Sequence, residues 1–190
     1  QGIQVFTAQR QDDPEFDSIC ADLADTDAPR QIIEHVTEHA GQLDILINNA
    51  GIMLEATVEK MSVEDWDRTL AVNLRAPFLL IKQALPYLRD GGRIVNIGSI
   101  EGLGSNARHP AYCASKAGLS SLCRCLAAEY AADGILVNEI RPGMVDAGVS
   151  AAEFRRNPGL REQVIEQMPV KYLIEPEEVA CQIAHLCNPT

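Results

Sequence analysis

Residues 93–116 read RIVNIGSIEGLGSNARHPAYCASK, and this stretch decides how the chain is interpreted. It begins with Arg93–Ile97, which is predicted to be a buried strand. Ser99 follows this strand directly, and Tyr112 and Lys116 stand at the start of a long helical pattern. Because side chains that follow parallel strands meet at the carboxyl edge of a sheet, these three side chains are expected to lie together.

The rest of the chain alternates between strand and helix patterns. Strands are predicted at Ile3–Ala8, Asp17–Ala21, Leu43–Ile47 and Ile135–Ile140. Helices are predicted at Thr26–Ala40, at Ala111–Ala132, in pieces over Ala151–Met168, and from Glu175 through Leu186. A further long helix is predicted from Ser62 towards Leu88. It is interrupted at Pro77 and Pro86, and Gly91-Gly92 ends it. This order implies right-handed βαβ crossovers, so we expect an α/β fold with a doubly wound parallel sheet.

Tyr112 and Lys116 are four residues apart, which places both side chains on one helical face. An ammonium group beside a phenol stabilises the phenolate and so lowers the pKa of the phenol. The pair is therefore a candidate proton donor and acceptor, and Ser99 is a candidate hydrogen-bond donor to a substrate oxygen. A hydrolase is disfavoured, because no serine in the sequence lies in a GxSxG nucleophile elbow.

Two asparagine segments are further candidates for a site. Asn48-Asn49-Ala50-Gly51 follows a buried strand, and its small residues let a ligand approach the backbone; an ordinary turn is the alternative. Asn73 lies in mid-helix, where Asn is disfavoured, and Pro77 has no N–H to bond the Asn73 carbonyl. That carbonyl is then available to hold a water at a kink; the alternative is a solvent-facing Asn beside a plain proline kink.

Composition and charge exclude several functions. The chain has 190 residues, of which 46% are hydrophobic, and 16 basic against 27 acidic residues give a net charge of −11. An acidic domain repels phosphate backbones, so nucleic acid is not an expected partner. The apolar runs are far shorter than the roughly 18–20 residues of a membrane helix, and no signal peptide is evident. We therefore expect a cytoplasmic protein without a membrane partner.

The six cysteines lie at positions 20, 113, 123, 125, 181 and 187 and include no pair of CxxC motifs. Cys123-x-Cys125 alone is not a zinc site, so the sequence predicts no metal centre. We interpret the cysteines as reduced thiols that pack as small hydrophobic residues, which fits a reducing cytosol.

Together these features resemble the short-chain dehydrogenase/reductase family. The matching elements occur in family order, and they are Asn48-Asn49-Ala50-Gly51, Asn73, Ser99, Tyr112-x-x-x-Lys116 and Val137-Asn138-x-Ile140-x-Pro142-Gly143. The resemblance covers nearly the whole chain, from Ile3 to Leu186. It implies a Rossmann-like fold and an NAD(P)-dependent oxidoreductase that transfers a hydride between nicotinamide and a carbonyl or secondary alcohol.

The resemblance also implies a role for each catalytic residue. Tyr112 would be the general acid in reduction and the base in oxidation. Ser99 would orient and polarise the carbonyl. Lys116 would hold the nicotinamide ribose and lower the pKa of Tyr112, and Asn73 would anchor a water that links Lys116 to solvent.

The same resemblance predicts the cofactor contacts. Family members that use NAD tend to carry a carboxylate at the end of the second strand, and Ala8-Gln9-Arg10 has none there. Arg10 could pair a 2′-phosphate instead of facing solvent, so NADP is favoured over NAD. Asp22 resembles the family's adenine-contacting residue, with a helix N-terminal charge as the alternative. The full expected set is Arg10, Asp22, Leu23, Asn49, Ala50, Gly51, Tyr112, Lys116, Pro142, Gly143 and Val145.

Three features depart from the family pattern. The Gly-rich TGxxxGxG turn is absent, and residues 2–8 resemble the family's second strand, so residues 1–190 are expected to form a single but partial NAD(P)-binding domain. The family's first strand and last strand are both expected to be missing from the chain given. Ala147 stands where the family often has a Thr that bonds the nicotinamide amide, which leaves the Val145 backbone for that bond.

The most specific activity implied is that of a 3-oxoacyl-carrier-protein reductase. The alternatives are a polyol or sugar dehydrogenase and, from another class, a non-catalytic binding protein on the same fold. The helical patterns at Val63–Leu88 and Ala111–Ala132 are richer in apolar and small residues than one sheet face needs, so we expect a homo-oligomer, a dimer or a tetramer. Glu101 and His109 flank the catalytic segment, each as a candidate substrate contact or a plain surface residue.

Overall fold

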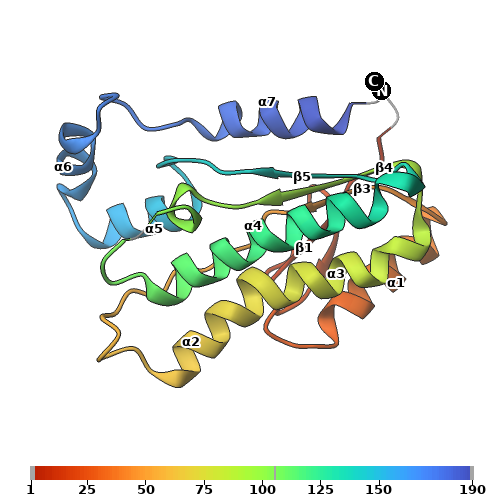
Figure 1. The fold of residues 1–190 in the computed structure, drawn as a ribbon, viewed down its shortest axis with the longest axis horizontal. Coiled ribbons are helices and arrows are strands. Elements are labelled where there is room, and N and C mark those ends of the chain that lie inside the picture. Colours follow the sequence, from red (N-terminus) through yellow and green to blue (C-terminus); the bar gives the residue numbers. More distant parts are fainter. Residues whose placement is uncertain (1–2, 105, 189–190) are drawn as a thin grey trace.

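The computed structural model describes residues 3–104 and 106–188 and has an α/β architecture (Figure 1). The strands are β1 (Phe6–Gln9), β2 (Asp17–Cys20), β3 (Leu43–Asn48), β4 (Leu88–Ile97) and β5 (Leu136–Ile140). The α-helices are α1 (Ala28–Ala40), α2 (Val63–Leu70), α3 (Ala76–Ala84), α4 (Pro110–Tyr130), α5 (Gly148–Arg156), α6 (Leu160–Gln167) and α7 (Pro176–Cys187). Within the described residues, no helix is both long enough and apolar enough to span a bilayer.

All strand pairs are parallel, as the βαβ pattern predicts. Strands β3, β4 and β5 form a three-stranded sheet in that order, and β1 pairs with β2 in a separate two-stranded sheet. The α/β class with parallel strands is therefore confirmed within the described residues. The two parallel sheets fit a doubly wound sheet that lacks the strand between them. This agrees with the expectation that the family's first strand, which precedes the Gly-rich turn, is missing.

Helices cover both faces of the three-stranded sheet. Helices α1, α3 and α4 lie on one face, and α7 lies on the other (Figure 1). The interface is aliphatic, and the most deeply buried large side chains include Ile81, Ile94, Val95 and Leu119. Ile94 and Val95 of β4 are fully buried because the strand lies between two helical layers.

The helical stretch after Ser62 is divided into segments with different hydrogen bonding. The Ser62 hydroxyl accepts a bond from the Asp65 N–H at 3.0 Å and so caps the start of α2. Residues Ala71–Arg75 form a π-helical turn between α2 and α3, and the Ala76 N–H bonds to the Ala71 carbonyl. The kink expected near Pro77 is thus present, and its form is the π-turn that often marks functional sites.

The end of this stretch was predicted wrongly. A 3₁₀ turn at Leu85–Tyr87 closes the helix, and β4 already begins at Leu88, so Gly91-Gly92 lies within the strand. Gly91 has a φ of 85°, which a glycine adopts without strain, and the pairing of β3 with β4 shifts register near the start of both strands. The glycines therefore form an irregularity in the strand and not a helix stop.

The observed ends of other helices differ from the predicted ends by a few residues. Helix α4 begins at Pro110, because proline at the first helical position has its φ already fixed and lacks an N–H that would go unpaired. Residues 151–168 are helical in two pieces, as predicted, with Gly159 at a φ of 86° before α6.

Candidate functional site

Four side chains proposed from sequence to be catalytic lie close to the carboxyl end of β4. Ser99 follows β4, Tyr112 and Lys116 project from the first turns of α4, and Asn73 lies in the π-helical turn. All four are buried, with exposed fractions of 9% for Ser99, 9% for Tyr112, 4% for Lys116 and 1% for Asn73. Four polar side chains buried this deeply need partners, and their contacts decide what they can do.

Tyr112 lies between Ser99 and Lys116. The Lys116 Nζ lies 5.7 Å from the centre of the Tyr112 ring, and the Ser99 side chain is near enough to affect the pKa of the phenol. Burial raises the pKa of the phenol, and the Ser99 hydroxyl opposes part of that rise. The direction is opposite to the one expected from Lys116, because burial, the largest cause of the shift, disfavours the charged phenolate. Tyr112 is therefore neutral at pH 7 and is a proton donor.

Lys116 is a buried amine with one protein partner in the described structure. Its Nζ donates to the Ile97 carbonyl at 2.7 Å. Burial lowers the pKa of Lys116 from 10.5 to about 8, and the negative charge of Glu139 opposes that fall. The ammonium form is thus retained at neutral pH, with N–H groups left over for a ligand.

Glu139 belongs to a buried network that the sequence did not reveal. Its side chain is 5% exposed, and its two oxygens accept bonds from the Ser120 hydroxyl at 2.6 Å and from the Arg141 Nε at 2.8 Å. A Cβ on Gly98 would lie 2.1 Å from a Glu139 oxygen, so this carboxylate requires glycine at position 98. The fully bonded carboxylate supplies a fixed negative charge near Lys116.

Asn73 is fixed by three hydrogen bonds. Its Oδ1 accepts from the Ile52 N–H at 2.9 Å, and its Nδ2 donates to the Ile52 carbonyl at 2.8 Å and to the Ser115 hydroxyl at 3.1 Å. The amide therefore ties the π-helical turn to the segment after β3 and to α4. Ser115 was missed from sequence, although its place beside Lys116 in the helix was a usable signal.

Gly51 separates Asn73 from Lys116. A Cβ there would lie 3.5 Å from the Asn73 Oδ1 and 3.6 Å from the Lys116 Nζ. Asn49 and Ala50, just before it, are exposed. The segment after β3 thus brings a small, open stretch of backbone next to the lysine.

Glu101 and His109 form a second cluster at the start of α4. The His109 Nδ1 lies 3.0 Å from the Glu101 Oε2, and the Asn106 Nδ2 donates to the Glu101 Oε1 at 2.8 Å. Both partners of the pair are largely buried, with side-chain exposures of 11% and 20%. The alternative of plain surface residues is therefore excluded, and the pair holds the loop before Tyr112 in place.

The candidate adenosine contacts lie beyond β1 and β2. Arg10 is exposed directly after β1, and its charge contributes to a lowered pKa of Asp22. The largest cause of that lowering is the Ala24 N–H, which donates to Asp22 at 2.9 Å, and Arg68 bonds the same carboxylate at 2.9 Å. Leu23 is half-buried and packs on the hydrophobic core. Arg10 and Asp22 thus share one surface region.

The segment after β5 contains the remaining candidates. The Pro142 carbonyl accepts from the Ile100 N–H at 3.2 Å, which fixes it beside the loop after Ser99. Val145 forms a parallel bridge with Ile174, and a Cβ on Gly143 would lie 3.6 Å from the Ile174 side chain. These residues, the segment after β3 and the Ser99–Tyr112–Lys116 group all follow the strands of one sheet, where ligands of such sheets bind.

A buried amide pair was also missed from sequence. The Asn48 Nδ2 donates to the Asn96 Oδ1 at 2.8 Å, and the Asn96 Nδ2 lies 3.1 Å from the Cys123 sulfur. The pair joins β3 to β4 just below the candidate site. This hydrogen bond fixes the positions of the ends of β3 and β4 relative to each other.

Comparison with known proteins identifies the family. The family model described as enoyl-(acyl carrier protein) reductase matches residues 4–190. An uncharacterized oxidoreductase of Thermotoga maritima is 40% identical over 158 residues, which are 80% of this chain and 63% of that protein. The 3-oxoacyl-[acyl-carrier-protein] reductase FabG of the same organism is 32% identical over 174 residues, covering 90% of this chain and 70% of that protein. The chain therefore spans about two thirds of the length of such relatives.

Solved structures agree with this result. A short-chain dehydrogenase from Burkholderia cenocepacia in complex with NADP is 34% identical, with a TM-score of 0.84 over 90% of this chain and 69% of that chain. Ligand-free aldohexose dehydrogenase from Thermoplasma acidophilum is 28% identical, with a TM-score of 0.88 over 97% of this chain and 77% of that chain. The sequence motifs, the fold and these matches together establish that the chain belongs to the short-chain dehydrogenase/reductase family.

Proposed function

We propose that the protein is an NADP(H)-dependent oxidoreductase that interconverts a carbonyl and a secondary alcohol. The observation that carries the proposal is the buried Tyr112, with the buried Ser99 near its phenol and Lys116 beside its ring. A neutral phenol held at the carboxyl edge of a parallel sheet is a proton donor placed where ligands bind. Such a donor can protonate the oxygen of a carbonyl as that carbonyl is reduced.

In the proposed mechanism, Tyr112 and Ser99 act on the same substrate oxygen. The Ser99 hydroxyl donates a hydrogen bond that orients the carbonyl, and the Tyr112 phenol gives its proton to the carbonyl oxygen as negative charge develops there. When bound, the nicotinamide supplies the hydride in reduction and accepts it in oxidation. In oxidation, Tyr112 accepts the proton from the alcohol.

Lys116 and Asn73 support this proton transfer. The Lys116 ammonium is attractive to the phenolate that forms on Tyr112, and Asn73 fixes the π-helical turn against the segment after β3. Pro77 has no N–H for the Asn73 carbonyl, so this carbonyl is free to hold a water that returns a proton towards Lys116.

The residues present fit the ribose and nicotinamide end of a dinucleotide. Within the described residues Lys116 uses one of its three N–H donors, and Gly51 leaves the space beside Nζ open. Lys116 and Tyr112 would hold the ribose hydroxyls, and the Val145 backbone would meet the nicotinamide amide. The remaining proposed contacts are Arg10, Asp22 and Leu23 for the adenosine end and Asn49, Ala50, Gly51, Pro142 and Gly143 along the edge of the sheet.

A 3-oxoacyl thioester on a carrier is the proposed substrate. Support comes from the relative named as a 3-oxoacyl-[acyl-carrier-protein] reductase, while the aldohexose dehydrogenase neighbour supports a sugar as the second candidate. Steady-state rates of the intact protein with a 3-oxoacyl thioester and with a set of aldoses and polyols decide between them. Faster turnover of the thioester supports the proposal, and faster oxidation of aldoses overturns the substrate while leaving the reaction type intact.

The cofactor preference is the first testable prediction. The guanidinium group of Arg10 can donate two hydrogen bonds to a 2′-phosphate, and one charge-assisted bond contributes roughly 1.5–3 kcal/mol. The value of kcat/KM should therefore be about ten- to a hundredfold higher with NADPH than with NADH. The double variant Gln9→Asp, Arg10→Ala should reverse that order, because Asp accepts a bond from a free 2′-hydroxyl. Arg30→Ala on α1 is the control, since it removes the same charge elsewhere. Equal use of NADH by the unmutated protein would contradict the assignment.

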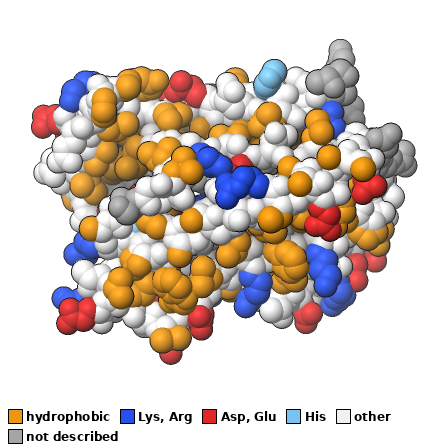
Figure 2. Space-filling view, viewed as in Figure 1, with side chains coloured by type: hydrophobic (Ala, Val, Ile, Leu, Met, Phe, Trp, Pro, Cys, Tyr) orange, Lys and Arg blue, Asp and Glu red, His pale blue; other side chains and the backbone are white. Residues whose placement is uncertain are grey.

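We also propose a homo-oligomer built on the outer face of α2, the π-helical turn, α3 and α4. Figure 2 shows hydrophobic side chains gathered over these helices. A hollow of about 580 Å³ there is lined by Asp67, Leu70, Ala71, Leu74, Arg75, Phe78 and Leu122. Phe78 is 45% exposed and Trp66 is 37% exposed, and burial of such side chains stabilises association.

The second prediction concerns this face. Light scattering of the intact protein at micromolar concentration should give the mass of a dimer or tetramer. Phe78→Glu places a charge in the hollow and should yield monomers, whereas Val170→Glu, at a site 56% exposed between α6 and α7, should not. A monomeric unmutated protein, or an unchanged mass for Phe78→Glu, would contradict the assignment of this face.

Residues 1–190 are proposed to act as one NAD(P)-binding domain within the cytoplasm. The six cysteines are free thiols, which suits a reducing compartment.

A further inference from the structure

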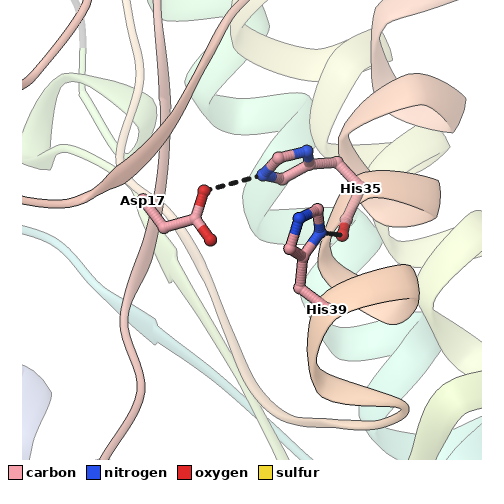
Figure 3. A group of neighbouring side chains, drawn as sticks. All are labelled: Asp17, His35 and His39. Atoms are coloured by element: carbon pink, nitrogen blue, oxygen red, sulfur yellow. Dashed lines mark hydrogen bonds and ion pairs between the residues drawn. The ribbon is translucent and has the colours of Figure 1, made fainter.

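A cluster of metal-ligating side chains lies outside the candidate active site. Asp17 comes from β2, and His35 and His39 come from successive turns of α1 (Figure 3). One ligand atom from each of the three side chains lies within 4.8 Å of the other two. None of the three has a part in the proposed reaction.

The hydrogen bonds of His39 leave one of its nitrogens ready for a metal. Its Nδ1 lies 2.7 Å from the His35 carbonyl, one turn back in the same helix. A carbonyl only accepts hydrogen bonds, so Nδ1 carries the proton and Nε2 keeps its lone pair. A histidine that donates one ring N–H to a backbone carbonyl and offers the other nitrogen is the arrangement found around protein-bound metals.

His35 and Asp17 already face each other. The His35 Nε2 lies 2.9 Å from the Asp17 Oδ1, and both side chains are partly open to solvent, at 27% and 38% exposure. Donors around a tetrahedral ion at about 2.0–2.1 Å stand roughly 3.3 Å apart, so small side-chain rotations suffice to admit an ion between these groups. The open side leaves room for water to complete the coordination.

Packing keeps the three side chains on one face. Phe6 of β1 is the register partner of Asp17, so both side chains point to the same side of the two-stranded sheet. The Phe6 ring packs edge-on against His35 at 6.1 Å and lies 6.4 Å from the His39 ring. The two imidazoles are 4.4 Å apart between centroids. The ligands are therefore held close together before any ion arrives.

We propose that Asp17, His35 and His39 bind one divalent transition-metal ion of the Zn²⁺ type. Two imidazoles and one carboxylate suit Zn²⁺, Co²⁺ or Ni²⁺, whereas Mg²⁺ and Ca²⁺ prefer oxygen ligands alone. The ion joins β2 to α1, two elements that share few other contacts, and therefore stabilises this edge of the protein. The site is structural, and it is independent of the proposed reaction.

The test uses the intact protein after removal of metals and alkylation of accessible thiols, because Cys20, Cys125 and Cys181 are exposed. Titration with Co²⁺ is followed by its visible absorption and titration with Zn²⁺ by calorimetry. The expected result is one ion per chain and a melting temperature that rises by about 2–4 °C with added Zn²⁺. An excess of Mg²⁺ should not displace Co²⁺.

Variants separate this site from adventitious binding. His39→Gln and Asp17→Asn should each weaken Zn²⁺ binding by about tenfold or more, because each removes a ligand while keeping a side chain of similar shape. His185→Gln, at an exposed histidine of α7, is the matched control and should bind as the unmutated protein does. Stoichiometric binding that survives both ligand variants, or no binding by the unmutated protein, overturns the proposal. Circular dichroism at each step shows that the variants are folded.

Discussion

Tyr112→Phe is expected to lower kcat/KM by about 10²–10⁴-fold with the fold intact. The substitution removes the phenolic hydroxyl, the proton donor of the proposed mechanism, and keeps a ring that is 9% exposed and lies 5.7 Å from the Lys116 Nζ. Affinity for NADPH should fall by about tenfold at most, because the proposed ribose contact of the Tyr112 hydroxyl is lost while that of Lys116 remains. Steady-state kinetics and NADPH fluorescence titration measure the two effects separately.

Tyr87→Phe is the control for this variant. Tyr87 is 41% exposed in the 3₁₀ turn before β4, so the loss of its hydroxyl should leave kcat/KM unchanged. Activity of Tyr112→Phe within a few-fold of the unmutated protein would mean that another group supplies the proton, and the assigned mechanism would fail.

Lys116→Met is expected to abolish activity and, at pH 7, to raise the free energy of unfolding by about 1–3 kcal/mol. Lys116 is 4% exposed, and burial lowers its pKa from 10.5 to about 8. The unfolded chain therefore holds the lysine proton more tightly than the folded protein does. Methionine removes this cost of burying a charge, at the loss of the bond from Nζ to the Ile97 carbonyl.

The pH dependence identifies the cause of this gain. Between pH 8 and 10.5 the unfolded state binds more protons at Lys116 than the folded state, so the contribution of this lysine makes stability rise with pH. The advantage of Lys116→Met should accordingly be constant below pH 8 and shrink above it. Urea unfolding of both proteins at pH 7 and pH 10 tests this. A variant that is less stable at pH 7, or a difference that does not narrow, would contradict the burial argument.

Local sequence patterns were sufficient to predict the elements that carry the site. The predicted strand Arg93–Ile97 is part of β4, and the YxxxK spacing places Tyr112 and Lys116 on one side of α4. Pro77 correctly indicated a break near Asn73. These features depend on residues close together in the chain, which periodicity and proline chemistry read directly.

The features that sequence reasoning missed depend on distant residues or on the balance of opposing effects. Ser120, Glu139 and Arg141 meet only after α4 packs on β5, and Gly98 is required by that carboxylate rather than by a turn. The raised pKa of Tyr112 is a second case, because burial is its largest cause and burial cannot be read from spacing.

The metal-ligating cluster was missed for a similar reason. His35 and His39 have helical spacing, but Asp17 joins them from β2, and only the pairing of β2 with β1 places it on the same side as Phe6. The cysteine pattern, on which the prediction of no metal centre was based, carries no information about this set of ligands.

A single-turnover experiment tests the central claim most directly. The intact protein, loaded with NADPH, is mixed rapidly with an excess of a 3-oxoacyl thioester, and NADPH fluorescence and the hydroxyl product are followed together. The account predicts that one NADPH is oxidised for each hydroxyacyl product in the unmutated protein, and that Tyr112→Phe binds NADPH without oxidising it at a comparable rate. Equal oxidation rates in the two proteins would contradict it. So would an unmutated protein that leaves NADPH reduced with the thioester and leaves NADP⁺ oxidised with every aldose.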